Sequence, residues 1–260
     1  MKVDKIIMSC DDTERYLKLW PYVSKICKLT LGITPVLFHI TDKYSDFIHD
    51  EYGIVKKIKK DPDLPASFQA QIYRLYGTKF FKNETCLISD IDMLTFNRQY
   101  FLDQVKEYDE NDFIIYIFDA YDLSREDCHG AWALNRIPMC YNLAKGRTFC
   151  ELLNLDVDFN EFAERVYNFN FGYDFPIFHR DEIFLGKMIF RNLKRINIVK
   201  LNRGITDLFN INRRIEKNNF YDVDSSLIHN GHYVEAHIPG DWETNLEKFN
   251  QVINHILVYS

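Results

Sequence analysis

Short apolar runs alternate with helical segments along the first half of the 260-residue chain, and several runs are followed by an acidic residue. Continuous apolar runs are typical of strands that are buried on both faces, as in parallel sheets covered by helices. The runs expected to form strands are Lys5–Cys10, Pro35–Ile40, Ile54–Ile58, Thr85–Ser89, Asp112–Asp119 and, late in the chain, Asn197–Leu201. The alternation therefore predicts a single α/β domain with a mostly parallel central sheet.

Helical segments lie between these runs, as parallel pairing of successive strands requires. Asp11-Asp12-Thr13 offers N-cap residues for a helix that runs to Gly32, and Pro21 is expected to kink or split it. The other expected helices are Ala66–Phe81, a segment that ends near Asn154, and Leu246–Val258, with Leu246, Phe249, Ile253 and Ile256 or Leu257 facing inward.

Candidate functional residues gather where the expected strands end. Parallel strands present their carboxyl ends at one edge of the sheet, and ligands bind outside that edge in sheets of this kind. The residues that fall there are Cys10, Asp11, His39, Asp90, Asp92 and Asp119. Their convergence predicts a binding site at this edge.

The acids of Asp90-Ile91-Asp92 directly follow a buried run. Acids two positions apart on an extended chain point to the same side. Mg²⁺ and Mn²⁺ prefer carboxylate oxygens and share their remaining positions with water and substrate phosphates. The pair therefore indicates a divalent-cation site, with a solvent-exposed turn as the alternative.

Composition excludes several classes of function. A net charge of −6 disfavours an electrostatic nucleic-acid binder, and the basic stretch Val55–Lys60 fits a strand with solvated lysines. No apolar segment approaches the roughly 20 residues that span a bilayer. No signal peptide opens the chain, and its six cysteines form no CxxC pair, so free thiols are expected. We expect a soluble, cytoplasmic protein.

The segments SFQAQIYRLY (Ser67–Tyr76) and CLISDIDMLTFNRQYF (Cys86–Phe101) resemble nucleotide-sugar glycosyltransferases of the GT-A fold. The likeness is nearest to the small glycosyltransferases of large algal DNA viruses and to related bacterial enzymes. It runs from Lys5 to about His237 and is strongest over Ser67–Phe101. It implies a Rossmann-like sheet within one domain, residues 1–260, in which residues 1–120 bind the nucleotide and residues 121–260 bind the acceptor.

The resemblance also implies roles for particular residues. In that family the paired acids bind Mn²⁺ or Mg²⁺, which bridges the diphosphate of the sugar donor. Asp92 would then bind the metal, and Asp90 would contact the metal or the ribose and sugar of the donor. Arg74 would lie beside the donor. An arginine near the metal could hold an acid of the motif or a diphosphate, and a solvated helix arginine is the alternative. The other residues assigned to the donor pocket are Ser9, Cys10, Asp11, His39 and Gln71.

The segment Phe178–Leu185 resembles the acidic motif that opens a helix beneath the acceptor site of inverting GT-A enzymes. Inversion needs one base that takes the proton of the acceptor hydroxyl, and Asp181 or Glu182 is the candidate. Asp119 is the second choice. The alternative is that Asp181 only caps the helix.

Three of the eight histidines fall in the segment Leu227–Trp242. By resemblance to the closing motif of the family, His237 is favoured as the third metal ligand over His229 and His232. Imidazole is a suitable ligand for Mn²⁺ beside carboxylates. The alternative is that these histidines are ordinary loop residues.

Together these features predict a metal-dependent transferase that moves a sugar from a nucleotide-diphosphate donor, with a UDP-sugar as first choice, to a hydroxyl of a glycan acceptor, preferably with inversion. Trp132, Tyr141 and Asn142 would shape the acceptor side or belong to the core. A nucleotidyltransferase or phosphohydrolase is one alternative, although the chain lacks a glycine-rich phosphate loop. A non-catalytic nucleotide-sugar or carbohydrate-binding module is another. The sequence leaves the oligomeric state open.

Overall fold

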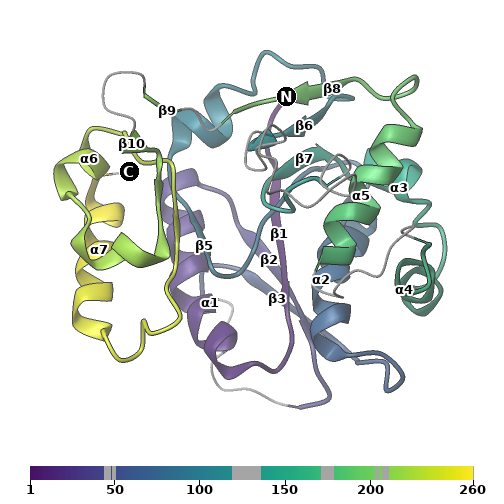
Figure 1. The fold of residues 1–260 in the computed structure, drawn as a ribbon, viewed down its shortest axis with the longest axis horizontal. Helices are drawn as coiled ribbons and strands as arrows, with labels where there is room; N and C mark the ends of the chain where they lie inside the picture. The colour runs from purple at the N-terminus through teal and green to yellow at the C-terminus, as the bar shows by residue number, and fades with distance from the viewer. Residues whose placement is uncertain are drawn as a thin grey trace, which may run out of the picture.

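The computed structural model describes residues 1–43, 48, 51–118, 136–170, 179–202, 205–206 and 211–259. A seven-stranded sheet forms its centre, in the order β3-β2-β1-β4-β7-β6-β8 (Figure 1). The strands are β1 (Lys5–Cys10), β2 (Pro35–Ile40), β3 (Ile54–Ile58), β4 (Thr85–Ile88), β6 (Phe113–Ile115), β7 (Asn142–Lys145) and β8 (Ile198–Lys200). All neighbours pair in parallel except β7, which is antiparallel to β4 and β6. The predicted mostly parallel sheet is confirmed.

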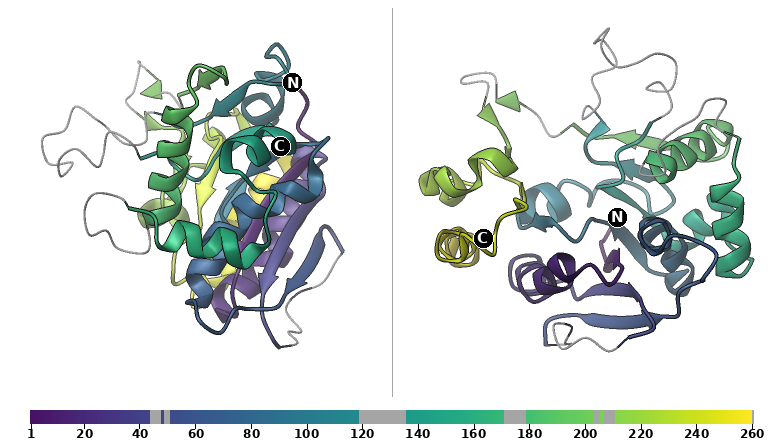
Figure 2. Two further views of the ribbon diagram at one scale, coloured as in Figure 1. Left: turned by 90° about the vertical axis from the view of Figure 1, so that its right-hand side faces the viewer. Right: turned by 60° about the horizontal axis from the view of Figure 1, so that its bottom comes forward.

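Helices cover both faces of this sheet (Figures 1 and 2). On one face lie α1 (Glu14–Ile26), α6 (Ser225–His229) and α7 (Leu246–Tyr259). On the other lie α2 (Ala66–Tyr76), α3 (Gly146–Leu153), α4 (Phe159–Tyr167) and α5 (Arg180–Arg191). Each face has its own apolar core, so the sheet is buried between two layers of helices.

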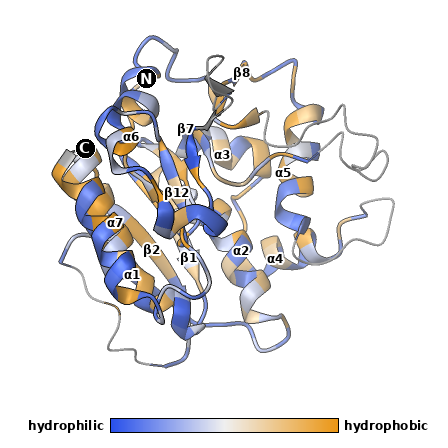
Figure 3. Ribbon diagram, turned by 60° about the vertical axis from the view of Figure 1, so that its left-hand side comes forward, coloured by the Kyte–Doolittle hydropathy of each residue, from blue (hydrophilic) through white to orange (hydrophobic). Residues whose placement is uncertain are grey.

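Burial explains why these segments take these forms. Every residue of β2 is buried, as its continuous apolar sequence requires. In α1 and α7 apolar side chains recur on the face toward the core, and Figure 3 shows hydrophilic residues alternating with them along both helices. Among the residues placed in the structure, no helix is long and apolar enough to cross a membrane.

A second, three-stranded sheet lies beside the first, in the order β11-β12-β5. It joins β11 (Arg214–Ile215), β12 (Glu235–His237) and β5 (Met93–Thr95). Strand β12 is parallel to β11 and antiparallel to β5, so the last part of the chain is bound to the segment that directly follows Asp92. Strands β9 (Ile205–Thr206) and β10 (Ile211–Asn212) form a separate antiparallel pair.

Two predicted helices differ from expectation. Pro21 was expected to kink or split the first helix, and α1 continues through it without a split, because Leu17, Trp20 and Val23 bury one face of the helix along its length. A π-helical turn follows, and Gly32 ends it at φ +74° as predicted. Helix α2 changes to a 3-10 helix at Gly77, where the chain lies so close to the ring of Phe38 that a side chain would meet it.

Other differences concern strand length and orientation. The expected strand Asp112–Asp119 is shorter in the structure, where β6 spans Phe113–Ile115, and Asp119 lies outside the described residues. Leu246 is 44% exposed, so its inward placement is wrong, because it forms the first turn of α7 at the protein surface. Phe249, Ile253 and Ile256 face the core as predicted.

Candidate functional site

A pocket of about 480 Å³ opens at the carboxyl ends of β1 and β4, the edge that the sequence indicated. Residues from both halves of the chain line it: Ser9, Cys10, Asp11, Thr13, Tyr16, Pro65, Ser67, Ala70, Gln71, Arg74, Asp90, Ile91, Asp92, Asp181, Glu182, Lys217 and His237. Of the residues assigned to the metal, the donor pocket or the base, and described in the structure, His39 is absent from this lining.

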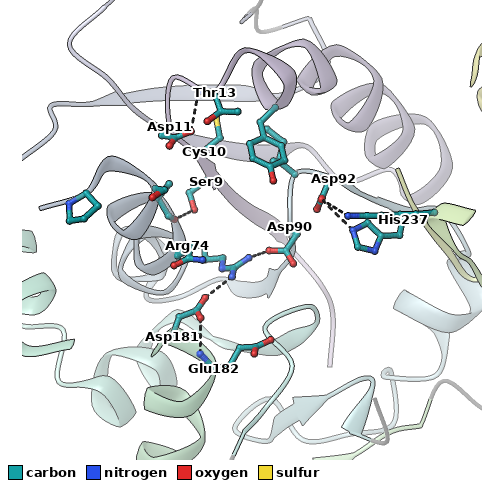
Figure 4. Close-up of a pocket in the computed structure, with 17 residues that line it drawn as sticks. Ser9, Cys10, Asp11, Thr13, Arg74, Asp90, Asp92, Asp181, Glu182 and His237 are labelled. Atoms are coloured by element: carbon teal, nitrogen blue, oxygen red, sulfur yellow. Dashed lines mark hydrogen bonds and ion pairs between the residues drawn. The ribbon is translucent and has the colours of Figure 1, made fainter. Parts of the chain in front are cut away.

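Arg74 joins two acids across the pocket (Figure 4). Its Nη2 atom donates to Oδ2 of Asp181 at 2.6 Å, and its Nη1 atom forms an ion pair with Oδ1 of Asp90. Arg74 comes from α2, Asp90 follows β4, and Asp181 lies in the first turn of α5. One guanidinium therefore connects the end of a central strand to the first turn of α5, which lies 107 positions after Arg74 along the chain.

Asp181 is 1% exposed, and its burial determines its chemistry. Burial raises the pKa of this carboxyl group above its usual value, the positive charge of Arg74 opposes that rise, and the adjacent Glu182 adds to it. Its Oδ1 atom accepts from the N–H of Glu182, but the residue that caps α5 is His179. The interpretation of Asp181 as an N-cap is therefore wrong.

Glu182 also faces the pocket. Its carboxylate forms an ion pair with Nε of Arg136 and lies 3.7 Å from Nδ1 of His179. Two acids with different partners thus stand side by side at the start of α5, one held by Arg74 and one by Arg136.

Asp92 and His237 form a second cluster, on the other side of Asp90 (Figure 4). The N–H of Ile238 donates to the carbonyl oxygen of Asp92 at 2.9 Å, which aligns β12 with the residue before β5. This alignment places Nε2 of His237 3.3 Å from Oδ2 of Asp92. The pairing of β5 with β12 is thus what brings the predicted third metal ligand to the predicted acid.

Two cations that the sequence analysis did not identify stand near Asp92. Lys217 Nζ lies 3.7 Å and Arg15 Nη2 3.9 Å from its Oδ2 atom. Burial acts to raise the pKa of Asp92, but His237, Lys217 and Arg15 outweigh it, and the net shift is downward. Arg15 follows the predicted N-cap at Thr13 and could have been noted at the strand edge, whereas no sequence signal distinguishes Lys217.

The chemical types of these side chains suit a divalent metal ion. Two carboxylates and an imidazole are a suitable ligand set for Mn²⁺, and Asp92 already faces His237. Asp90, however, is engaged by Arg74, and within the described part of the chain no three His, Cys, Asp or Glu side chains converge as a ready ligand set. Asp90 would have to leave Arg74 to complete the shell.

The end of β1 forms the opposite wall of the pocket. Ser9 donates from its hydroxyl to the carbonyl oxygen of Ala70, and Asp11 accepts the N–H of Thr13 at 3.0 Å. Cys10 is buried, and burial raises the pKa of its thiol, with Asp11 and Asp12 adding to the rise. Cys10 therefore contributes to the pocket wall as a small, uncharged side chain.

His39 does not reach the pocket. It is fully buried at the end of β2, and its Nε2 atom lies 3.0 Å from Oδ1 of Asp12. Burial lowers the pKa of His39, which favours the neutral imidazole. Its position at the strand edge was predicted, but its side chain turns to the loop after β1 and not to the other candidates.

His229 and His232 are also absent from the pocket lining. The ring of His229 packs against His255 at 5.4 Å between centroids, and His232 packs against Tyr233 at 5.1 Å. Of the three late histidines, the structure brings only His237 to the acids, as the resemblance implied.

The residues considered for an acceptor side belong to the core where the structure describes them. Tyr141 is fully buried, and Asn142 uses its amide to donate to the carbonyl oxygens of Pro138 and Met139. Trp132 lies outside the described residues. The structure therefore offers no acceptor-side aromatic from this segment among the residues it describes.

Comparison with known proteins identifies the fold. No family model matches the chain, and no curated protein matches its sequence. Among solved structures, the galactosyltransferase LgtC in complex with donor and acceptor sugar analogues is similar with a TM-score of 0.56 at 12% identity, over 96% of this chain and 95% of that one. An active-site mutant of LgtC gives 0.54 at 13% identity, over 96% and 95%. The chain therefore has the fold of GT-A glycosyltransferases, as expected.

Proposed function

We propose that this chain is a metal-dependent glycosyltransferase, which moves a sugar from a nucleotide-diphosphate donor, with UDP as first choice, to a hydroxyl of a glycan acceptor. The observation that carries the proposal is the single pocket in which Asp90, Asp92, Arg74, Asp181 and His237 meet. The shared fold with a galactosyltransferase supports it. The pocket combines metal-binding side chains with cations that can face a diphosphate.

Mn²⁺, or Mg²⁺, would be held by Asp92 and His237, with Asp90 as a further ligand. When bound, the metal would neutralise charge on the departing diphosphate. Lys217 and Arg15 already surround Asp92 with positive charge, and they would orient the same phosphates by direct contact. Arg74 would hold the sugar end of the donor near Asp181.

The base would be Asp181 or its neighbour Glu182. A buried carboxyl group with a raised pKa accepts a proton more readily than an exposed one, and Asp181 has that environment. Inversion would follow if this carboxylate takes the proton of the acceptor hydroxyl while the oxygen attacks the anomeric carbon and the diphosphate leaves. An NMR assay that reads the anomeric configuration of the first product tests whether the transfer proceeds with inversion.

Residues 1–120 would contribute most of the nucleotide side of the pocket, and residues 121–260 the acceptor side. The nearer likeness to enzymes of algal DNA viruses, and a place in the cytoplasm, stay predictions from sequence.

The proposed donor site is tested by thermal unfolding with UDP, GDP, CMP and dTDP, each with and without Mn²⁺. A ligand that binds only the folded protein at a hundredfold excess over Kd adds about 2.7 kcal/mol of stability. We expect one nucleotide to raise Tm only when Mn²⁺ is present, and we expect the rise to vanish in Asp92→Asn. The control is Asp103→Asn, because Asp103 pairs with Lys106 at the surface. No rise with any nucleotide would overturn the proposal.

The products decide between the proposed transferase and the other classes. A nucleotidyltransferase would release pyrophosphate, and a phosphohydrolase would release phosphate without sugar transfer. A non-catalytic module would bind the donor and leave it intact. Asp181→Asn distinguishes the non-catalytic module from the transferase. The transferase would lose its sugar-transfer activity in this variant, whereas a binding module has no such activity to lose.

A further inference from the structure

Arg214 contacts His237 from the side away from the acids. It lies on β11, beside β12, in register with Glu235. Its Nη2 atom is 2.9 Å from Nδ1 of His237 and 3.0 Å from Sδ of Met93. Arg214 is not part of the pocket lining, but it contacts His237, which is.

This contact fixes which ring nitrogen of His237 carries hydrogen. A guanidinium has donors and no acceptor, so Nδ1 of His237 must accept. In a neutral imidazole the hydrogen then belongs to Nε2, and this atom faces Oδ2 of Asp92 at 3.3 Å. The chain Arg214–His237–Asp92 is therefore a row of hydrogen bonds that runs in one direction.

That arrangement conflicts with metal binding through Nε2. A metal ligand needs a lone pair on Nε2, which places the hydrogen on Nδ1, where it would meet an N–H of Arg214. Two N–H donors cannot form a hydrogen bond with each other. Arg214 has other acceptors close by, because its Nε atom lies 3.7 Å from Oε2 of Glu216 and 3.7 Å from Oε1 of Glu235. A short shift of the guanidinium toward these acids would release His237.

We propose that Arg214 is a positioning residue that holds His237 as a hydrogen-bond donor to Asp92, and that metal binding requires Arg214 to move from His237 to Glu216 or Glu235. This inference rests on the metal site of the proposed function. It makes Arg214 a determinant of metal affinity although it touches neither the metal nor the donor. The arginine keeps Asp92 and His237 paired until a metal replaces that pairing.

Direct measurement of Mn²⁺ binding tests the proposal without any transfer assay. Titration calorimetry and the electron paramagnetic resonance signal of free Mn²⁺ would compare the intact protein with Arg214→Met. We expect about tenfold tighter binding in Arg214→Met, because binding no longer has to break a hydrogen bond to a charged donor. The matched control is Arg213→Met. Arg213 donates to the carbonyl oxygen of His232 and not to His237, so we expect this variant to bind Mn²⁺ with unchanged affinity.

Arg214→Met also leaves the fully buried Glu235 with less positive charge beside it, and this could impair folding. The double variant Arg214→Met/Glu235→Gln removes that cost and should show the same gain in affinity. Equal or weaker binding in folded variants would overturn the role of Arg214 and leave the metal site intact. Absence of Mn²⁺ binding in every protein, the unmodified one included, would overturn both the metal site and this inference.

A second readout needs no variant. Long-range ¹H–¹⁵N NMR spectra of the metal-free protein distinguish the two forms of a neutral imidazole. We expect His237 to carry its hydrogen on Nε2 without metal and on Nδ1 with Zn²⁺ as a diamagnetic probe. A hydrogen on Nδ1 in the metal-free protein would contradict the proposal.

Discussion

Arg74 pairs with the buried Asp181, so its loss should reduce the stability of the protein. Arg74→Met leaves Asp181, 1% exposed, without its ion-pair partner. Removing one member of a buried pair typically costs about 3–5 kcal/mol. We expect a loss of that order in the free energy of urea unfolding at pH 7.

The control for this change is Arg147→Met. Arg147 pairs with Glu110 at the surface, and exposed pairs contribute less than about 1 kcal/mol. If both variants lost equally little stability, the Arg74–Asp181 pair would not be a buried ion pair in solution. The double variant Arg74→Met/Asp181→Asn should recover much of the loss, since it leaves no unpaired charge.

The raised pKa of Asp181 has a pH signature with a defined sign. Between its usual value of 3.8 and its raised value, the folded protein binds the proton of Asp181 and the unfolded chain does not. The contribution of Asp181 to the free energy of unfolding is therefore largest in acid and falls as pH rises through this window. We expect the stability of the unmodified protein, relative to Asp181→Asn, to decrease as pH rises above the usual pKa of 3.8 toward the raised pKa of the folded protein. Urea unfolding at several pH values measures it, and a relative stability that increased with pH would contradict the shift.

Sequence could identify most of the pocket residues, and Arg74 as a possible partner of one of the paired acids, but not which acid each side chain contacts. Asp90 and Asp92 were predicted because acids after a buried strand must face a cation or water, and His237 because of its resemblance to a family motif. That Asp90 would bind Arg74 while Asp92 binds His237 depends on where α2 and β12 lie, and no local pattern encodes this. His39 shows the same limit, since its position at the sheet edge was predicted but its partner, Asp12, was not.

The junction of α2 with the following 3-10 helix depends on the glycine that begins it. A Cβ at Gly77 would meet the ring of Phe38, so Gly77→Ala should cost about 1–3 kcal/mol by overpacking. Because the obstacle is a side chain, the cost should nearly disappear in a Phe38→Val background. Urea unfolding of the four proteins of this double-mutant cycle measures the coupling.

Gly146 provides the comparison for that experiment. A Cβ there would meet the carbonyl oxygens of Phe81 and Thr78, which are backbone atoms and cannot be removed by substitution. Gly146→Ala should remain costly whether or not Phe38 is changed. Equal rescue of both glycine variants by Phe38→Val would contradict this account.

Elements with a strong local signal were predicted well, and those fixed by distant partners were not. β1 and β2 coincide with the expected runs because six consecutive residues suited to burial leave little choice. Strand β7 was missed, because only four residues pair and their place between β4 and β6 is set by both neighbours. The 3-10 segment after Tyr76 was likewise not predicted, since it depends on the contact of Gly77 with Phe38 on β2.

The whole molecule should unfold as one unit. The core on one face of the sheet includes Val3 and Trp20 from the start of the chain and Trp242 and Phe249 from its end. Because both ends of the chain contribute to one core, the two halves should unfold together. We expect tryptophan fluorescence and far-UV circular dichroism to give the same denaturation midpoint. Two separate midpoints would indicate that the halves are independent domains.

The pairing of β5 with β12 determines when the candidate site can be completed during synthesis of the chain. Asp92 and His237 are 145 positions apart along the chain, and the strands that join them close one of its longest loops. On a ribosome, Asp92 emerges well before the segment that completes its surroundings. The candidate site is therefore assembled after most of the central sheet has been synthesised, and an interrupted chain would carry the acids without the histidine beside them.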